Sequence, residues 1–107
     1  MIDPYGPTDE ELRRWAAADA DAPVEDFDLM VATVDYIPIL LELVSTPKRC
    51  FAFDCLEIVI DDAVRTHFNT ATREQVELAL THAEEAASRD EDIASWVARS
   101  RARLRDV

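Results

Sequence analysis

The chain has 107 residues, of which 49% are hydrophobic and 32% are charged, a balance that predicts one globular domain with its own hydrophobic core. Its single glycine, Gly6, excludes the P-loop, the dinucleotide fingerprint and the nucleophile elbow, because each of these motifs needs several glycines. The formal net charge of −12 argues against binding to nucleic acid or to anionic membrane surfaces, which carry charge of the same sign.

Five helices are predicted, and capping signals mark most of their starts. Three pairs of residues have the spacing of a capping box, in which two side chains satisfy free backbone N–H groups at a helix start. They are Thr8 with Glu11, Thr72 with Gln75, and Ser88 with Glu91. Thr46 before Pro47 and the proline at position 23 mark the other two starts. We therefore expect one all-α domain over residues 1–107, with an extension at 1–7 and helices at 8–20, 23–45, 47–68, 72–87 and 89–105.

The two central helices are predicted to be apolar around most of their circumference. Pro38 lies inside the helix expected at 23–45, where a proline typically costs ~3 kcal/mol, so we expect a kink there. In the next segment, Asp54, Glu57, Asp61 and Arg65 recur at intervals of three, four and four residues. This spacing places them on one face of a helix and argues against a strand, in which polar positions would alternate.

One part of this pattern resembles a HEAT-type helical repeat. The resemblance is carried by residues 37–44, by Arg49, Ala52, Cys55 and Leu56 after a short turn, and by residues 90–96, which are similar to the opening of the second helix of a following repeat. In that family a first helix bent by proline ends in a leucine-rich turn, and the second helix begins with arginine. The resemblance implies antiparallel helical hairpins in HEAT-like stacking and a binding scaffold more than an enzyme.

No catalytic group, metal site or cofactor is predicted. Cys55 and His67 are twelve residues apart on one expected helix, which separates them by about 18 Å and excludes a nucleophilic pair. Asp61 and Asp62 would point about 100° apart on a helix and would not share a cation without other ligands. His82 precedes its glutamate, the reverse of the Glu-x-x-His order found in di-metal bundles, and we interpret it as a surface histidine.

The cysteines and the termini predict a cytoplasmic protein. On a helix, Cys50 and Cys55 would diverge by about 140°, too far for a disulfide, so we expect reduced thiols. The first residues lack the basic and apolar regions of a signal peptide, and the longest apolar segments carry aspartate and glutamate, so neither is a membrane span. Ten arginines against one lysine, with sixteen alanines, are typical of a bacterial genome rich in G and C.

The negative charge is concentrated in the first part of the chain, since residues 1–62 carry a net charge of −11 and residues 63–107 only −1. The single basic cluster comprises Arg99, Arg101, Arg103 and Arg105. We expect these arginines to complement the dipole of the last helix and to extend into solvent.

The carboxylates on the central helices are the candidate partner-binding residues. They are Asp28, Asp35, Glu42, Asp54, Glu57, Asp61 and Asp62. The first three are seven residues apart and would form a line along the helix at 23–45. If the next helix packs antiparallel beside it, both lines can form one acidic ridge that docks a basic partner. The alternative is that these carboxylates are only the solvent-exposed face of two buried helices.

These patterns favour a non-enzymatic protein-binding module, most specifically a small acidic inhibitor of the immunity type that neutralises a basic effector such as a toxin. Such a protein would bind a basic protein and would be a monomer or a weak homodimer on its own. One alternative is a regulatory or assembly subunit that oligomerises through apolar helix faces. Another is a small metal- or ligand-binding component of an enzyme.

Overall fold

A computed structural model describes residues 2–107 of the chain. Helices are the only regular structure in this range, so the all-α prediction is confirmed. The elements are α1 (Asp9–Ala17), α2 (Phe27–Val31), the 3₁₀ helix η1 (Val34–Tyr36), α3 (Ile37–Leu43), α4 (Arg49–Arg65), α5 (Arg73–Ala87) and α6 (Glu91–Arg105).

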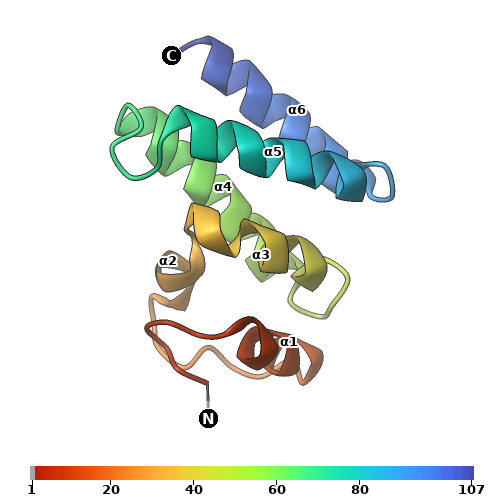
Figure 1. The fold of residues 1–107 in the computed structure, drawn as a ribbon. Coiled ribbons are helices and arrows are strands. Elements are labelled where there is room, and N and C mark those ends of the chain that lie inside the picture. The colour runs from red at the N-terminus through yellow and green to blue at the C-terminus, as the bar shows by residue number, and fades with distance from the viewer. Residues whose placement is uncertain (1) are drawn as a thin grey trace.

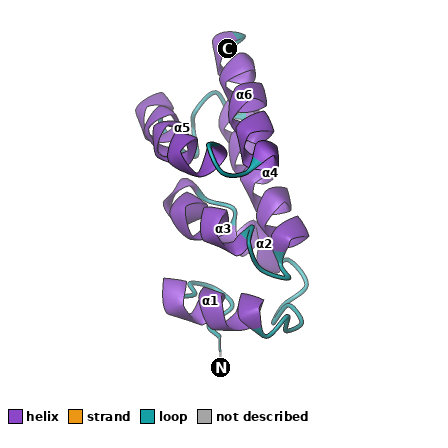
Figure 2. Cartoon of the chain, turned by 90° about the vertical axis from the view of Figure 1, so that its right-hand side faces the viewer, coloured by secondary structure: helices purple, strands orange, loops and turns teal. Residues whose placement is uncertain are grey.

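The helices lie in two layers. Figure 2 shows α1, α3 and α5 in one layer and α2, α4 and α6 in the other. Within the layers, α3 contacts both α1 and α5, and α4 contacts both α2 and α6; between the layers, α3 packs on α4 and α5 on α6. The molecule is therefore flat, with extents of 40 × 30 × 17 Å, and α1 and α6 lie at its opposite ends (Figure 1).

One hydrophobic core runs between the layers. Leu12, Leu40, Leu56, Leu80 and Trp96 come from five different helices, and each is 0% exposed. Burying side chains of this size stabilises the fold by roughly 1.5–3 kcal/mol each. The helices are thus joined into one unit by shared apolar contacts.

An aromatic cluster positions the short helix α2. Trp15 of α1 contacts Phe27 of α2 and Phe51 of α4 edge to face, with ring centroids 5.0 and 4.8 Å apart. Phe27 and Phe51 stack on each other at 5.6 Å. Because Phe27 anchors one side of α2 in the core, the opposite side of this helix faces outwards.

Two of the three predicted capping boxes are confirmed. The hydroxyls of Thr8 and Thr72 each accept a hydrogen bond from the third helical N–H, and the side chain at that position accepts one from the N-cap amide. The prediction at Ser88 is wrong, because Asp90 is the N-cap of α6 and accepts from the N–H groups two and three residues further on, at 2.9 and 3.3 Å. A carboxylate at this position also interacts favourably with the helix dipole.

The continuous helix predicted at 23–45, with its kink at Pro38, is wrong. The chain instead forms α2, η1 and α3, and Thr33 between the first two is extended, with φ −127° and ψ 159°. Pro38 lies in the first turn of α3, where its missing N–H breaks no helical hydrogen bond. Packing explains the break, because α2 packs on α4 whereas α3 must also reach α1 and α5 in the other layer.

The helical interpretation of residues 54–65 is confirmed, but α4 is shorter than predicted at both ends. Thr46 does not cap α4; its hydroxyl accepts from the Lys48 N–H at 3.1 Å in the turn before the helix. The helix ends at Arg65, because the next residues close a left-handed turn.

That turn is a Schellman motif without glycine. The N–H of Phe68 donates to the Ala63 carbonyl at 2.7 Å, and the N–H of His67 donates to the Val64 carbonyl at 3.2 Å. His67 and Phe68 have φ values of 52° and 62°, in the left-handed region that usually favours glycine. The loop after α4 therefore carries backbone strain that a glycine would relieve.

Candidate functional site

The structure does not gather the seven predicted partner-binding carboxylates into one ridge. Asp28, Asp35 and Glu42 were expected along one helix but lie in α2, η1 and α3, and α2 and α3 belong to different layers (Figure 2). The other four, Asp54, Glu57, Asp61 and Asp62, all lie on α4 as expected.

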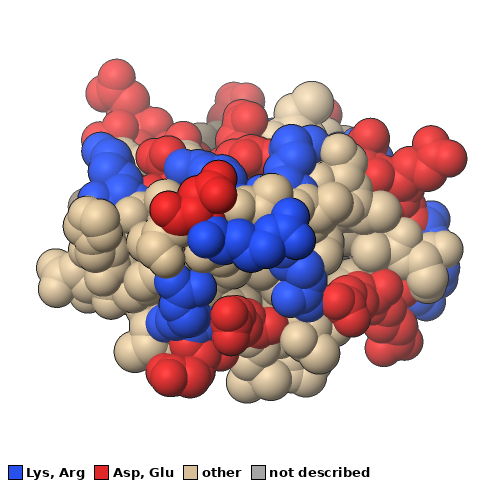
Figure 3. Space-filling model, turned by 90° about the horizontal axis from the view of Figure 1, so that it is seen from above, with Lys and Arg blue, Asp and Glu red and all other residues tan. Residues whose placement is uncertain are grey.

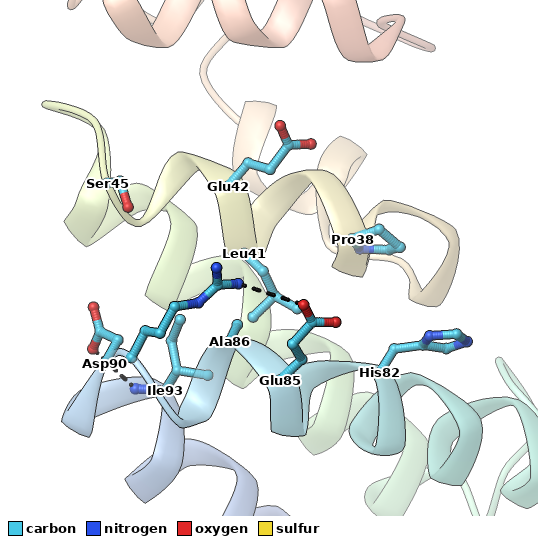
Figure 4. Close-up of a pocket in the computed structure, with 10 residues that line it drawn as sticks. Pro38, Leu41, Glu42, Ser45, His82, Glu85, Ala86, Asp90 and Ile93 are labelled. Carbon is cyan, nitrogen blue, oxygen red and sulfur yellow. Dashed lines mark hydrogen bonds and ion pairs between the residues drawn. The ribbon is translucent and has the colours of Figure 1, made fainter.

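Four of these seven carboxylates are paired with arginines. The pairs are Glu42 with Arg13, Glu57 with Arg99, Asp61 with Arg103, and Asp62 with Arg65. Glu42 accepts two hydrogen bonds from Arg13 of α1 and points away from α5 (Figure 4). Glu57 is bound from α6, at the opposite end of the molecule (Figure 1). The predicted single ridge is therefore wrong.

The arginines of α6 also differ from the prediction, because three of them do not simply extend into solvent. Arg99, Arg101 and Arg103 form ion pairs with carboxylates of α4 and α5. Seen from the α6 end, Figure 3 shows basic and acidic side chains interleaved over the surface. This face therefore has little uncompensated positive charge.

The other three predicted carboxylates, Asp28, Asp35 and Asp54, have no ion-pair partner among residues 2–107. Two of them, Asp28 and Asp54, lie near the buried thiol of Cys55. The backbone carbonyl of Asp28 accepts a hydrogen bond from the Cys55 thiol at 3.6 Å, which fixes α2 against α4. Burial, together with the nearby negative charges of Asp28 and Asp54, raises the pKa of Cys55 to about 12.

Two exposed apolar side chains directly follow Asp28 on α2. Leu29 is 54% exposed and Met30 is 38% exposed, both on the outward side of α2. We call Asp26, Asp28, Leu29, Met30 and Asp54 the α2 patch. Neither apolar residue was predicted as part of a site, because a continuous helix at 23–45 would have made them ordinary core positions. Residues 18–36 contain several acidic residues and no basic one, and this is the sequence signal that could have identified the segment as part of a site.

The second surface feature is a groove between α3 and α5, which we call the α3–α5 groove. It consists of two cavities of about 770 and 340 Å³ that share Pro38, Leu41 and His82. Leu41, Ala86 and Ile93 form apolar walls in the larger cavity (Figure 4). The side chain of Leu78, which borders the smaller cavity, is 60% exposed.

A network of ion pairs involves Asp90, which is one of the residues that line the larger cavity. The guanidinium of Arg49 donates to both oxygens of Asp90 at 2.9 and 3.1 Å, to Asp92 at 2.7 Å and to the Val44 carbonyl at 3.1 Å. The hydrogen bonds that Asp90 accepts from Arg49, and from the backbone N–H groups of Ile93 and Asp92, lower the pKa of Asp90 to about 2. The same guanidinium thus connects the end of α3, the start of α4 and the N-cap of α6.

Among residues 2–107 there is no group of three or more histidine, cysteine or acidic side chains that could hold a metal ion. The Cys55 thiol is buried and, with its raised pKa, stays protonated at neutral pH, so it is a poor nucleophile. Cys50 is an exposed free thiol.

No protein-family model matches this chain, and searches of the curated proteins and of the solved structures return no match either. No helix among residues 2–107 combines the length and the apolar character needed to cross a lipid bilayer.

Proposed function

We infer that this chain is a non-enzymatic protein-binding module whose partner is a basic protein. The α2 patch carries the inference, because it combines exposed apolar side chains with carboxylates that have no partner among residues 2–107. Burial of apolar contact area contributes to binding affinity. Charged residues around that area accelerate association with a partner of opposite charge and disfavour partners of the same charge.

The distribution of ion pairs supports the choice of this surface. Ion pairs with arginine compensate Glu42, Glu57, Asp61 and Asp62, so only part of the predicted acidic set offers free negative charge. Asp28 and Asp54 have no ion-pair partner among residues 2–107 and both lie near Cys55, and Asp28 directly precedes the exposed Leu29 on α2. A partner that brings lysine or arginine side chains to this position gains new ion pairs without breaking existing ones.

The same charge argues against a second copy of the chain as the partner. In a two-fold symmetric dimer the α2 patch would meet itself, and its three carboxylates would face three identical ones. Each chain also carries a net charge of −12. An assembly subunit that oligomerises through this face is therefore the weaker candidate.

The scaffold suits this role. We propose that the two layers, each formed by alternate helices of the chain, represent HEAT-like stacking, as the sequence resemblance at residues 37–56 implies. Scaffolds of stacked helical pairs present extended surfaces to protein partners. The most specific form of the proposal is an immunity-type inhibitor, located in the cytoplasm, that neutralises a basic bacterial effector.

Reversal of the patch charge tests this function. The chain would first be used to capture its partner from the source organism, and association rates of the purified pair would then be measured at low salt. We expect the double variant Asp28→Lys/Asp54→Lys to associate at least tenfold more slowly than the wild type, because steering depends on local charge.

A matched control separates position from total charge. The variant Glu74→Lys/Asp106→Lys makes the same change in net charge at two exposed carboxylates outside the α2 patch. Equal slowing in both variants would contradict the proposal, because it would show a dependence on net charge alone. Fast association that persists in 1 M salt would contradict it too, since the Debye length there is about 3 Å.

A further inference from the structure

We propose that the α3–α5 groove is the interface of a two-fold symmetric homodimer, in which Leu78 of each copy enters the larger cavity of the other. This inference goes beyond the proposed function, because it concerns a separate surface and needs no basic partner. The helix α2 lies in the other layer of the molecule, so the α2 patch stays accessible in such a dimer (Figure 2). One dimer thus presents two α2 patches.

The charges at the groove are compensated within the chain, and this allows a second copy to approach. Three of the four carboxylates that line the groove face arginines. The pairs are Glu42 with Arg13, Asp90 with Arg49, and Glu85 with Arg89. Only Asp35 lines the groove without an ion pair among residues 2–107. At physiological salt the Debye length is about 8 Å, so the excess negative charge elsewhere on the two chains is largely screened.

The groove carries both a projection and a hollow, as a self-complementary interface requires. Leu78 projects beside the smaller cavity, with 60% of its surface exposed. The larger cavity has apolar walls formed by Leu41, Ala86 and Ile93 (Figure 4). In a two-fold dimer each copy supplies both features, so two identical apolar contacts form together.

The positions of these features along α5 define one register. His82 lines both cavities, so it marks the centre of the groove. We place the two-fold axis there, between positions 81 and 82, with the two α5 helices antiparallel. Leu78 of one copy then lies level with Glu85 and Ala86 of the other, since each is about 5–7 Å from the axis at the helical rise of 1.5 Å per residue. Glu85 turns toward Arg89 (Figure 4), and the ridge of one helix fills the groove of the other.

The same register makes the charges of the two copies complementary. It places Glu74 of one copy level with Arg89 of the other, because positions 74 and 89 are equally far from the axis. Glu74 lies one turn before Leu78 and has no ion-pair partner among residues 2–107. Arg89 is 74% exposed and is held only loosely by Glu85, at 4.0 Å. Two equivalent ion pairs therefore flank the apolar contacts and fix the register.

Sedimentation velocity of the full-length chain tests the dimer. The chain is measured at physiological salt, at concentrations from about 10 μM to about 1 mM. We expect a reversible change from monomer to dimer over this range, and amide chemical shifts that change on dilution only in α3 and α5. A chain that stays monomeric at the highest concentration would overturn the proposal. Shifts centred on α2, or species larger than a dimer, would overturn it too, because a two-fold interface closes at two copies.

Two matched variants localise the interface. Leu78→Gln removes the exposed leucine of the groove, and Leu29→Gln removes a similarly exposed leucine of the α2 patch. We expect the first to raise the dissociation constant of the dimer at least tenfold and the second to change it less than twofold. Both positions are exposed on helices, and glutamine is helix-compatible, so both variants should fold. Equal weakening in the two variants would contradict the assignment to the groove.

Exchange of charge tests the register. Arg89→Glu places a glutamate opposite Glu74 of the other copy and should raise the dissociation constant at least fivefold. Arg105→Glu makes the same change in net charge at an exposed position of α6 and should have a smaller effect. The double variant Glu74→Arg/Arg89→Glu has the net charge of the wild type and reverses both ion pairs, so it should return the dissociation constant to within twofold of the wild type. If it does not, the register is wrong.

These measurements use the chain alone, without the basic partner of the proposed function. The association rates at the α2 patch are measured well below the dissociation constant of the dimer, where the chain is a monomer. The two proposals can therefore fail separately.

Discussion

The ion-pair network around Arg49 makes a quantitative prediction about stability. Replacing Arg49 with methionine keeps the length of the side chain and its helical preference but removes all four hydrogen bonds made by the guanidinium. The contact with the ring of Phe53, with the guanidinium carbon 5.1 Å from the ring centroid, loses its cationic part as well.

The expected loss follows from the exposure of the partners. The side chains of Arg49 and Asp90 are 39% and 21% exposed, so solvent screens their attraction in part. A surface ion pair contributes about 0.2–1 kcal/mol, and a hydrogen bond to a charged group ~1.5–3 kcal/mol when it is well shielded. Because this network has three acceptor groups and intermediate exposure, we expect Arg49→Met to lower the free energy of unfolding by about 2 kcal/mol.

A double-mutant cycle isolates the pair itself. Asp90→Asn retains an N-cap acceptor for α6 but removes the charge, and the cycle with Arg49→Met, followed by urea unfolding at pH 7, should give a coupling of about 1 kcal/mol. The more exposed pair of Arg99 and Glu57, at 56% and 48%, provides the comparison and should couple by less than about 0.5 kcal/mol. Equal coupling for both pairs would refute the reasoning.

The pH dependence gives an independent check of the same pair. The pKa of Asp90 is lowered from 3.8 to about 2 in the folded protein, so its ionisation stabilises the fold fully above about pH 4. That contribution is lost as the pH falls through 2, because the carboxylate becomes protonated. The difference in stability between wild type and Arg49→Met should therefore shrink from pH 4 to pH 2. A constant difference over this range would show that Arg49 acts through packing.

Two further predictions concern the loop after α4 and the thiols. His67→Gly should raise the free energy of unfolding by about 0.5–1 kcal/mol, because glycine removes the steric strain at φ 52°, and the greater entropy of the unfolded glycine variant offsets only part of this gain. Thermal unfolding measures the change, and His82→Gly within α5 should have the opposite effect. A lower melting temperature for His67→Gly would contradict the strain argument. A thiol reagent should modify Cys50 rapidly and Cys55 only on unfolding, because Cys55 is 0% exposed and its pKa is about 12. Mass spectrometry measures the modification of each thiol over time. Rapid modification of both thiols in the native protein would show that α2 opens readily.

The parts of the fold that were predicted correctly depend on interactions between near neighbours in the sequence. The capping boxes at Thr8 and Thr72 involve residues three positions apart, and the polar face of residues 54–65 reflects the helical repeat itself. The same local patterns, capping boxes and helical spacing of polar residues, distinguish an all-α fold from a fold that contains strands. Local spacing is sufficient for such features, because the interacting groups are within one turn of each other.

The candidate site could not be predicted in the same way, because its contacts join distant residues. Glu57 and Arg99 are 42 positions apart, and Glu42 and Arg13 are 29 apart, so their compensation of charge is visible only in the folded chain. The predicted set of seven carboxylates assumed that exposure implies free charge. The structure separates the paired from the unpaired members of that set.

Local patterns in the sequence were sufficient to predict that this protein is helical, that helices begin after Thr8 and Thr72, and that the chain carries a strong excess of negative charge. The position at which the segment 23–45 breaks depends on tertiary packing, because α2 and α3 pack into different layers and Pro38 is the one local signal for a break. That break exposes Leu29 and Met30 and so creates the α2 patch. Left-handed backbone at Asp19 and His67, in a chain with one glycine, has the same origin: tertiary packing imposes a turn that the local sequence does not favour.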